Sequence, residues 1–291
     1  MQKHVRSALM IKVGGSTLDA EFESNQALVS KSISPIKDLR HDYDLFITTG
    51  GGPAWDVRKQ WRKRYGTPID EFKEIAQLNL QMNAKELVTV FGHWATVCKP
   101  DEFNPLLFAS MSDNQIIRIC YWPPASFITS PEQSVQSDLQ TLLMAEALAQ
   151  VYAKVDVIFV KRTAGIYAFD PRLSGSKIKA IISNKRCAIN IKARYNQLYR
   201  DIEKARDNNS PLELNRLPLV TTSDMLTGGI SRLGEDGDDD HLIERSAITF
   251  LHDKQRKINT VGIIHYLHTH LIQEMITAPS ETSPYSFIVR G

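Results

Sequence analysis

Cysteine is scarce in this chain, and the three that occur, Cys98, Cys120 and Cys187, lie far apart in the sequence. An odd number of cysteines argues against a framework of disulfides, and the absence of a C-x-x-C pair leaves no zinc motif. The composition therefore favours a reducing compartment, and we expect a cytoplasmic protein.

Long apolar runs and a net charge of one sign are also lacking. No window approaches the roughly 20 apolar residues of a membrane span, and the apolar run near the N-terminus is too short for the core of a secretory signal. The formal net charge is only +2, which gives no global argument for nucleic acid. We therefore expect a soluble protein with neither a membrane nor a nucleic acid as its partner.

The 291 residues suffice for one large α/β domain or two small ones. Short apolar runs alternate with stretches that have helical spacing, which favours a largely parallel sheet covered on both faces. The predicted strands are 9–13, 45–49, 116–120, 155–160, 217–220 and 260–265. The predicted helices are 53–64, 71–91, 137–150 and 242–254.

Several charged or titratable groups stand apart from this pattern of strands and helices, and most of them have two interpretations. Residues 191–209 form a strongly charged predicted helix, and the acidic loop 234–241 is either a solvated loop or a cation site. The basic stretch 59–64 is either a solvated helix end or an anion-recognition surface. The histidines are either surface residues or ligands of a metal or oxyanion. They are His241, His252, His265, His268 and His270.

Two predicted strands end in glycines, in the stretches "ALMIKVGGST" and "LFITTGGGPAWDVRK". Glycine lets a backbone approach a phosphate closely, and the N-terminus of a following helix offers unpaired N–H groups. Neither stretch matches the P-loop or the dinucleotide fingerprint. Each one alone is equally compatible with an ordinary turn. A third stretch, 137–172, begins with Ser137-Asp138, typical of a helix start, and ends in a loop containing Gly165, Tyr167 and Asp170-Pro171.

In this order, the motifs resemble those of the amino acid kinase superfamily. Members carry K-x-G-G after the first strand, G-G-G after the second, a (T/S)-D pair at a mid-chain helix and a G-(V/I)-Y-x-x-(D/N)-P loop. The matching residues here are Lys12-Val13-Gly14-Gly15, Gly50-Gly51-Gly52, Ser137-Asp138 and 165–171. A weaker match is Asp224–Ile230, and the C-terminal segment is similar to the closing strands of the family. The branch containing uridylate kinases, isopentenyl phosphate kinases, other small-phosphate kinases and molybdenum storage proteins is the most similar.

The resemblance implies a role for each matching residue in ATP-dependent phosphoryl transfer with Mg²⁺. Lys12 would stabilise the transferring group, and Asp138 would orient that lysine. The implied phosphate- and nucleotide-binding residues are Gly14, Gly15, Ser16, Lys161, Gly165, Tyr167 and Pro171. The implied substrate-binding residues are Gly50, Gly51, Gly52 and Arg58. The resemblance leaves the metal ligands unassigned.

Four departures from the family pattern keep a second interpretation open. Ala164 replaces an acidic residue, Lys161-Arg162 replaces a T-D pair, Leu233 replaces a lysine, and His265-Tyr266 replaces an N-G pair. The alternative is a molybdenum- or tungsten-storage protein, or another nucleotide-binding protein without turnover, on the same fold.

The resemblance implies a three-layer α/β/α sandwich with a mainly parallel central sheet, formed as a single domain over 1–291. The lobe of about 1–150 would bind the phosphoryl acceptor, and the lobe of about 151–291 the nucleotide. We expect a kinase, a transferase acting on a small anionic or phosphorylated metabolite, that assembles as a homo- or hetero-oligomer of this fold.

Overall fold

The computed structural model describes residues 6–18, 31–111, 115–128, 137–161, 258–278 and 285–289. Several predicted features lie outside these ranges. They are the strand 217–220, the helices 191–209 and 242–254, the acidic loop 234–241, the motif at Asp224–Ile230, Cys187, His241, His252, Ala164, Gly165, Tyr167 and Pro171.

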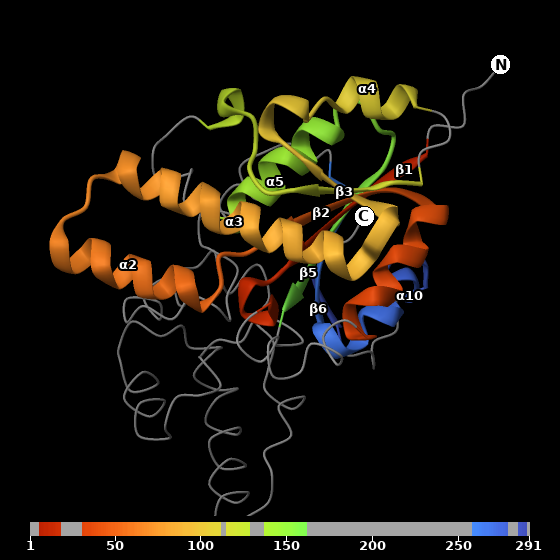
Figure 1. Ribbon diagram of the computed structural model, residues 1–291. Helices are drawn as coiled ribbons and strands as arrows, with labels where there is room; N and C mark the ends of the chain where they lie inside the picture. The colour runs from red at the N-terminus through yellow and green to blue at the C-terminus, as the bar shows by residue number, and fades with distance from the viewer. Residues whose placement is uncertain are drawn as a thin grey trace, which may run out of the picture.

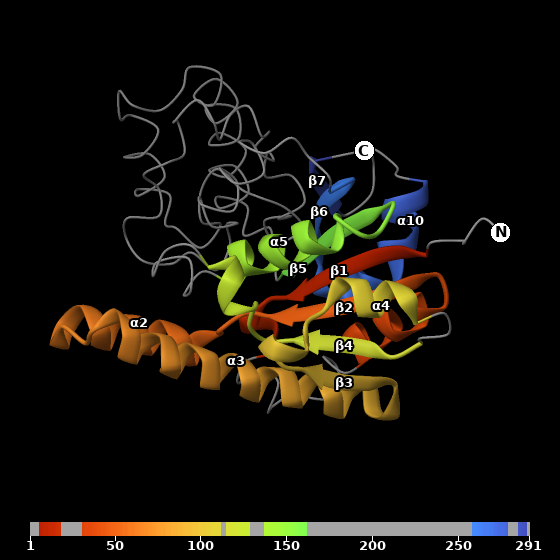
Figure 2. The same ribbon diagram turned by 90° about the horizontal axis from the view of Figure 1, so that it is seen from above.

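The described residues form a seven-stranded sheet with the order β3-β4-β2-β1-β5-β6-β7 (Figure 2). The strands are β1 (Ser7–Val13), β2 (Tyr43–Thr49), β3 (Ala95–Cys98), β4 (Ile117–Cys120), β5 (Val155–Lys161), β6 (Thr260–His265) and β7 (Tyr285–Val289). All neighbouring pairs are parallel except β6 and β7. The prediction of a mainly parallel sheet is confirmed.

Helices cover both faces of this sheet, so the molecule has three layers (Figure 1). One face packs against α3 (Ile69–Phe91), α10 (Ile272–Thr277) and the 3-10 segment η2 (Ser34–His41). The other face packs against α4 (Pro105–Ser110) and α5 (Ser137–Leu148). The predicted α/β/α sandwich is therefore the observed fold.

Strand β1 shows why a lysine can stand in an apolar run. Leu9, Ile11 and Val13 belong to one core, and Ala8 and Met10 to the other. Since side chains alternate along a strand, Lys12 shares the face of Ala8 and Met10 and packs on the α5 side at the carboxyl end. The lysine is therefore the last residue of the α5-facing row of β1.

Helices α2 (Pro53–Tyr65) and α3 form a hairpin that extends beyond the sheet (Figure 2). Pro53 occupies the first turn of α2, where a missing N–H is harmless. Gly66 ends α2 in the left-handed conformation, with φ of 68°. The hairpin brings one face of α3 back beside the glycine loop that follows β2.

Strand β3 and helix α4 are among the observed elements that were not predicted. Strand β3 has only four residues and a mostly half-exposed pattern, so its periodicity is too short to detect. Helix α4 has only six residues. Small boundary differences also occur: α3 begins at Ile69 and not at 71, and α5 ends at Leu148 and not at 150.

Candidate functional site

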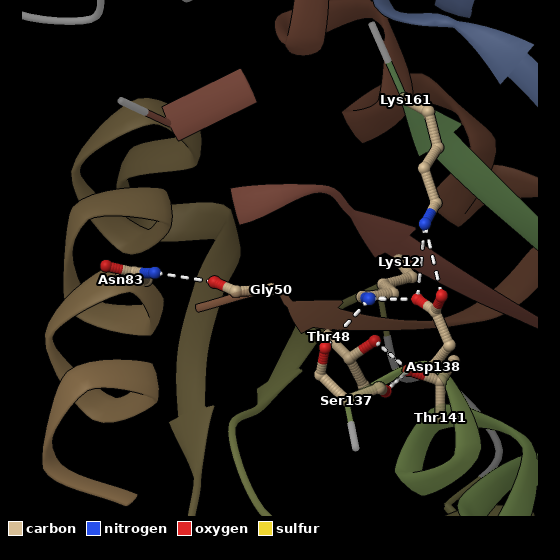
Figure 3. Close-up of polar contacts among 8 residues, drawn as sticks. All are labelled: Lys12, Thr48, Gly50, Asn83, Ser137, Asp138, Thr141 and Lys161. Carbon is tan, nitrogen blue, oxygen red and sulfur yellow. Dashed lines mark hydrogen bonds and ion pairs between the residues drawn. The ribbon is translucent and has the colours of Figure 1, made fainter. Parts of the chain in front are cut away.

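The first component of the site is a buried lysine at the carboxyl end of β1. Lys12 is 4% exposed. Its Nζ donates a hydrogen bond to Ser137 Oγ at 2.9 Å and forms an ion pair with Asp138 Oδ1 (Figure 3). The structure thus brings together two residues that are 126 positions apart, Lys12 and Asp138, which the resemblance had linked in function.

A second lysine reaches the same carboxylate from β5. Lys161 Nζ lies 3.1 Å from Asp138 Oδ2 and 3.5 Å from Oδ1, and the residue is 6% exposed. Two ammonium groups therefore share one carboxylate in a buried environment (Figure 3). Among these three side chains two ammonium groups face one carboxylate, an arrangement that suits the approach of an anion.

The charge state of Asp138 follows from this arrangement. Burial of the carboxyl acts to raise its pKa, but the charges of Lys12 and then Lys161, with their hydrogen bonds, outweigh burial. The net result is a pKa below the ordinary aspartate value. Asp138 is therefore ionised at neutral pH, which suits it to hold the two lysines and not to exchange protons.

A pair of threonines anchors the start of α5 to the sheet. Thr141 Oγ1 donates to the Ser137 carbonyl oxygen at 2.8 Å, and it lies 2.7 Å from Thr48 Oγ1 on β2. Both threonines are buried. The contacts hold Ser137 and Asp138 at a set position above β1 and β2, so the direction of the Lys12 side chain is also determined.

The two glycine loops lie directly against each other. A Cβ added to Gly15 would lie 1.9 Å from Gly52 N, and one added to Gly50 would lie 2.5 Å from Gly15 N. Gly52 also has φ of 68° and ψ of −175°, a conformation that only glycine adopts readily. The close contact between the two backbones therefore requires glycine at these positions, whether or not a phosphate binds there.

Two of the loop amides are used by the sheet. Gly14 N–H donates to the Val160 carbonyl oxygen at 2.9 Å, and Gly50 N–H donates to the Val13 carbonyl oxygen at 2.9 Å. We had expected the Gly14 amide to face a phosphate, but it continues the hydrogen bonding between β1 and β5 instead. Ser16 follows in the 3-10 turn η1 (Gly15–Leu18).

Helix α3 contributes residues that sequence reasoning missed. Asn79 Nδ2 donates to the Gly51 carbonyl oxygen at 2.6 Å, and Asn83 Nδ2 donates to the Gly50 carbonyl oxygen at 2.7 Å. The predicted substrate residue Arg58 donates through Nη1 to Asn79 Oδ1 at 3.0 Å. The only signal in the sequence is the spacing of four between the two asparagines, which places them on one face of α3.

The described histidines stand near Lys161 but do not form a metal centre. His265 is the strand partner of Lys161, and the His265–His268 and His268–His270 ring centroids are 5.8 and 6.1 Å apart. Burial and then the neighbouring His270 lower the pKa of His268. Within the described ranges, no group of three histidine, cysteine or carboxylate side chains is placed to hold a metal ion.

Comparisons with known proteins support the fold. No family model and no curated protein matches the chain. A UMP kinase from Bacillus anthracis superimposes with a TM-score of 0.56 at 14% identity, over 92% of this chain and 91% of that chain. An aspartate kinase from Synechocystis gives 0.53 at 11% identity, over 98% of this chain and 40% of that one. An isopentenyl phosphate kinase in a substrate complex gives 0.50 at 12% identity, over 97% and 100%.

Each of these three structures has the amino acid kinase fold, and each superimposes on more than nine tenths of this chain. Among the described helices, none is long and apolar enough to cross a membrane. The resemblance suggested by the ordered motifs is thus matched by the three-dimensional arrangement, and the chain has the fold of the amino acid kinase superfamily.

Proposed function

We propose that this protein is an ATP-dependent phosphotransferase that acts on a small anionic or phosphorylated metabolite. The observation that carries the proposal is the Lys12–Asp138–Lys161 cluster at the carboxyl end of the sheet, next to two interlocked glycine loops. In open parallel sheets, ligands bind at this end of the strands. Two buried lysines beside bare glycine backbone suit a polyphosphate.

The two lysines would neutralise charge on the phosphates during transfer. In the transferring step, the bond between the γ-phosphorus and the bridging oxygen of ATP breaks while a bond to the acceptor oxygen forms, and negative charge spreads over the phosphoryl oxygens. Lys12 would stabilise the transferring group, and Lys161, from the half of the chain assigned to the nucleotide, would contact the adjacent phosphate. Asp138 would keep both ammonium groups in position without accepting a proton.

The acceptor would lie over Gly51 and Gly52, at the N-terminus of α2. That terminus presents unpaired N–H groups and the positive end of the helix dipole, which favour an anionic acceptor. Mg²⁺ would enter with the phosphates of ATP, because the described residues offer no carboxylate cluster for it.

A matched pair of lysine variants tests this function. We expect Lys12→Ala to abolish transfer of ³²P from [γ-³²P]ATP to a panel of small phosphates and carboxylates. Lys154→Ala is the control, because Lys154 pairs with Asp156 at the opposite end of the sheet. Failure of the wild type to bind Mg·ATP in calorimetry would refute the proposal. Binding of Mg·ATP without any transfer would favour the alternative, a storage or nucleotide-binding protein, which metal analysis of the purified protein would then examine.

We also infer that the α2–α3 hairpin mediates assembly with a copy of this fold. Exposed apolar side chains recur on α2 at spacings of four, Val57, Trp61 and Tyr65, and α3 has two more at the same spacing, Leu78 and Met82. An exposed apolar area of this kind marks an association surface. Trp61→Ser with Leu78→Ser should reduce the mass of the particle in analytical ultracentrifugation. An unchanged mass would contradict this inference.

A further inference from the structure

We propose that Asn79 and Asn83 are positioning residues that orient the backbone amides of Gly51 and Gly52 for an anionic group, and that Arg58 acts through Asn79. The proposal rests on the proposed function for the identity of that group, the acceptor or the transferring phosphoryl. Neither asparagine was implied by the resemblance.

The first argument is that each asparagine takes one carbonyl of the glycine loop. Asn83 donates to the oxygen of Gly50, and Asn79 donates to the oxygen of Gly51 (Figure 3 shows the first contact). A carbonyl oxygen can only accept, so the side-chain nitrogens are the atoms that face the loop. Two successive turns of α3 therefore bind two consecutive peptide units of the loop, in the opposite order along the chain.

The second argument concerns the direction of the amides. In a planar trans peptide, the C=O and the following N–H point in opposite directions, and the described residues contain no cis peptide. Holding the Gly50 and Gly51 carbonyls towards α3 therefore turns the N–H groups of Gly51 and Gly52 away from α3. Two adjacent amides then face the same side of the loop, where the first turn of α2 adds further N–H groups.

The third argument is that the asparagine clamp, meaning the contacts of Asn79 and Asn83 with the loop carbonyls, is itself held in place. Asn79 is 5% exposed, and its Oδ1 accepts from Arg58 Nη1 at 3.0 Å. The relay Arg58–Asn79–Gly51 leaves both ends of the Asn79 amide satisfied, so the side chain cannot rotate without losing two hydrogen bonds. Glycine loops are conformationally free by themselves, and Gly52 adopts a φ of 68°. The asparagines supply the rigidity that the glycines lack.

The test uses isosteric variants and inorganic phosphate as the probe. Asn83→Asp and Asn79→Asp keep the shape of the side chain but remove the donated N–H, and Asn79→Asp retains a partner for Arg58. Titration of phosphate, followed by the Gly51 and Gly52 amide signals in ¹H–¹⁵N spectra of the full chain, should show about tenfold weaker binding in each variant, because the loop amides are no longer held towards the anion.

Gln81→Glu is the matched control, since it introduces the same charge change on the same helix. It should leave the phosphate affinity within about twofold of the wild type. Asn83→Ala removes the donor without adding charge and should weaken binding like Asn83→Asp. Thermal unfolding of each variant checks that the fold is retained.

The outcomes separate this proposal from the proposed function. Phosphate affinity that is equal in the wild type, Asn79→Asp and Asn83→Asp would overturn the clamp, and so would wild-type Gly51 and Gly52 signals that do not respond to phosphate. Either result would leave Mg·ATP binding at Lys12 to be judged by calorimetry. Conversely, loss of phosphate affinity in both asparagine variants supports the clamp even if no acceptor in the panel is phosphorylated.

Discussion

The two ends of the central sheet both bury ionised side chains, but in different proportions. At the carboxyl end, Lys12 and Lys161 share the single carboxylate of Asp138. At the amino end, each buried carboxylate has one cation: Arg6 Nε lies 3.5 Å from Asp44 Oδ1, and Lys154 Nζ lies 3.2 Å from Asp156 Oδ2. At the amino end each of these carboxylates pairs with its own cation, whereas at the carboxyl end two cations share one carboxylate.

The two clusters also differ in the groups that surround them. Tyr152 Oη donates to Asp44 Oδ2 at 2.8 Å, and Arg6 also donates to the carbonyl oxygens of Arg40, His41 and Tyr43. These contacts close the amino end with side chains of the protein. At the carboxyl end the cations are more deeply buried: the side chains of Lys12 and Lys161 are 5% and 8% exposed, against 26% and 40% for Arg6 and Lys154. The number of cations on each carboxylate and the burial of those cations therefore distinguish the two clusters on the same sheet.

The largest expected effect comes from removing the shared carboxylate. Asp138→Asn would remove the carboxylate that Lys12 and Lys161 share, and breaking a buried ion pair in this way costs about 3–5 kcal/mol. Urea denaturation would measure the change in the free energy of unfolding. Because an anion could replace the lost negative charge, added ATP should recover part of the stability, and a variant as stable as the wild type without ATP would contradict the role assigned to Asp138.

The next largest effect concerns the contact between the glycine loops. Gly15→Ala would force a Cβ to within 1.9 Å of Gly52 N, so we expect a loss of about 2–3 kcal/mol in thermal or urea unfolding and a marked loss of phosphate binding. Gly66→Ala is the control: its Cβ would meet nothing within 4 Å. That variant should lose only about 1 kcal/mol, from the left-handed φ, and keep its binding.

A smaller effect is expected at the amino end. Tyr152→Phe removes the hydroxyl that donates to the buried Asp44 carboxylate, which costs about 1–2 kcal/mol. Phosphoryl transfer and Mg·ATP affinity should stay unchanged, because this cluster lies at the opposite end of the strands. A parallel loss of Mg·ATP affinity would show that the two ends are coupled and would break the comparison.

The smallest effect is one of pH, and it has opposite signs at the two ends. The pKa of Asp138 lies below its ordinary value, as the lysines outweigh burial, so its contribution to stability is present above about pH 4 and is lost as the pH falls further. The pKa of Tyr152 is raised, first by burial and then by Asp44, so its contribution is present below about pH 10 and is lost as the pH rises further. The free energy of unfolding should therefore be measured against pH in two variants. In Asp138→Asn it should fall less steeply at acid pH than in the wild type, and in Tyr152→Phe it should fall less steeply at alkaline pH.

Much of the sheet could be predicted because its strands are buried on both faces. The predicted strand 260–265 coincides with β6, and 9–13, 45–49 and 155–160 lie within β1, β2 and β5. Such continuous apolar runs stand out against their surroundings. The short β3 and α4 were missed, because four to six residues contain too little periodicity to separate them from a loop.

The candidate site was predictable only in part. Lys12, Asp138 and the glycines were implied by ordered motifs, whereas Asn79 and Asn83 belong to no motif and look like ordinary polar positions on a helix. Lys161 was expected to contact nucleotide phosphates, but the sequence contained no sign that it also pairs with Asp138. That pairing depends on β5 lying next to β1, a neighbour relation set by the crossover connections and not by local residues.

The sequence by itself determined where the long buried strands β1, β2, β5 and β6 form and that a lysine is followed by glycines at the end of the first strand. The tertiary structure alone decided that Lys12 and Lys161 share Asp138, that Gly15 and Gly52 touch, and that two asparagines hold the loop. The physical reason is range: periodicity and turn chemistry act over a few residues, whereas a charge cluster and a contact between backbones depend on which strands become neighbours.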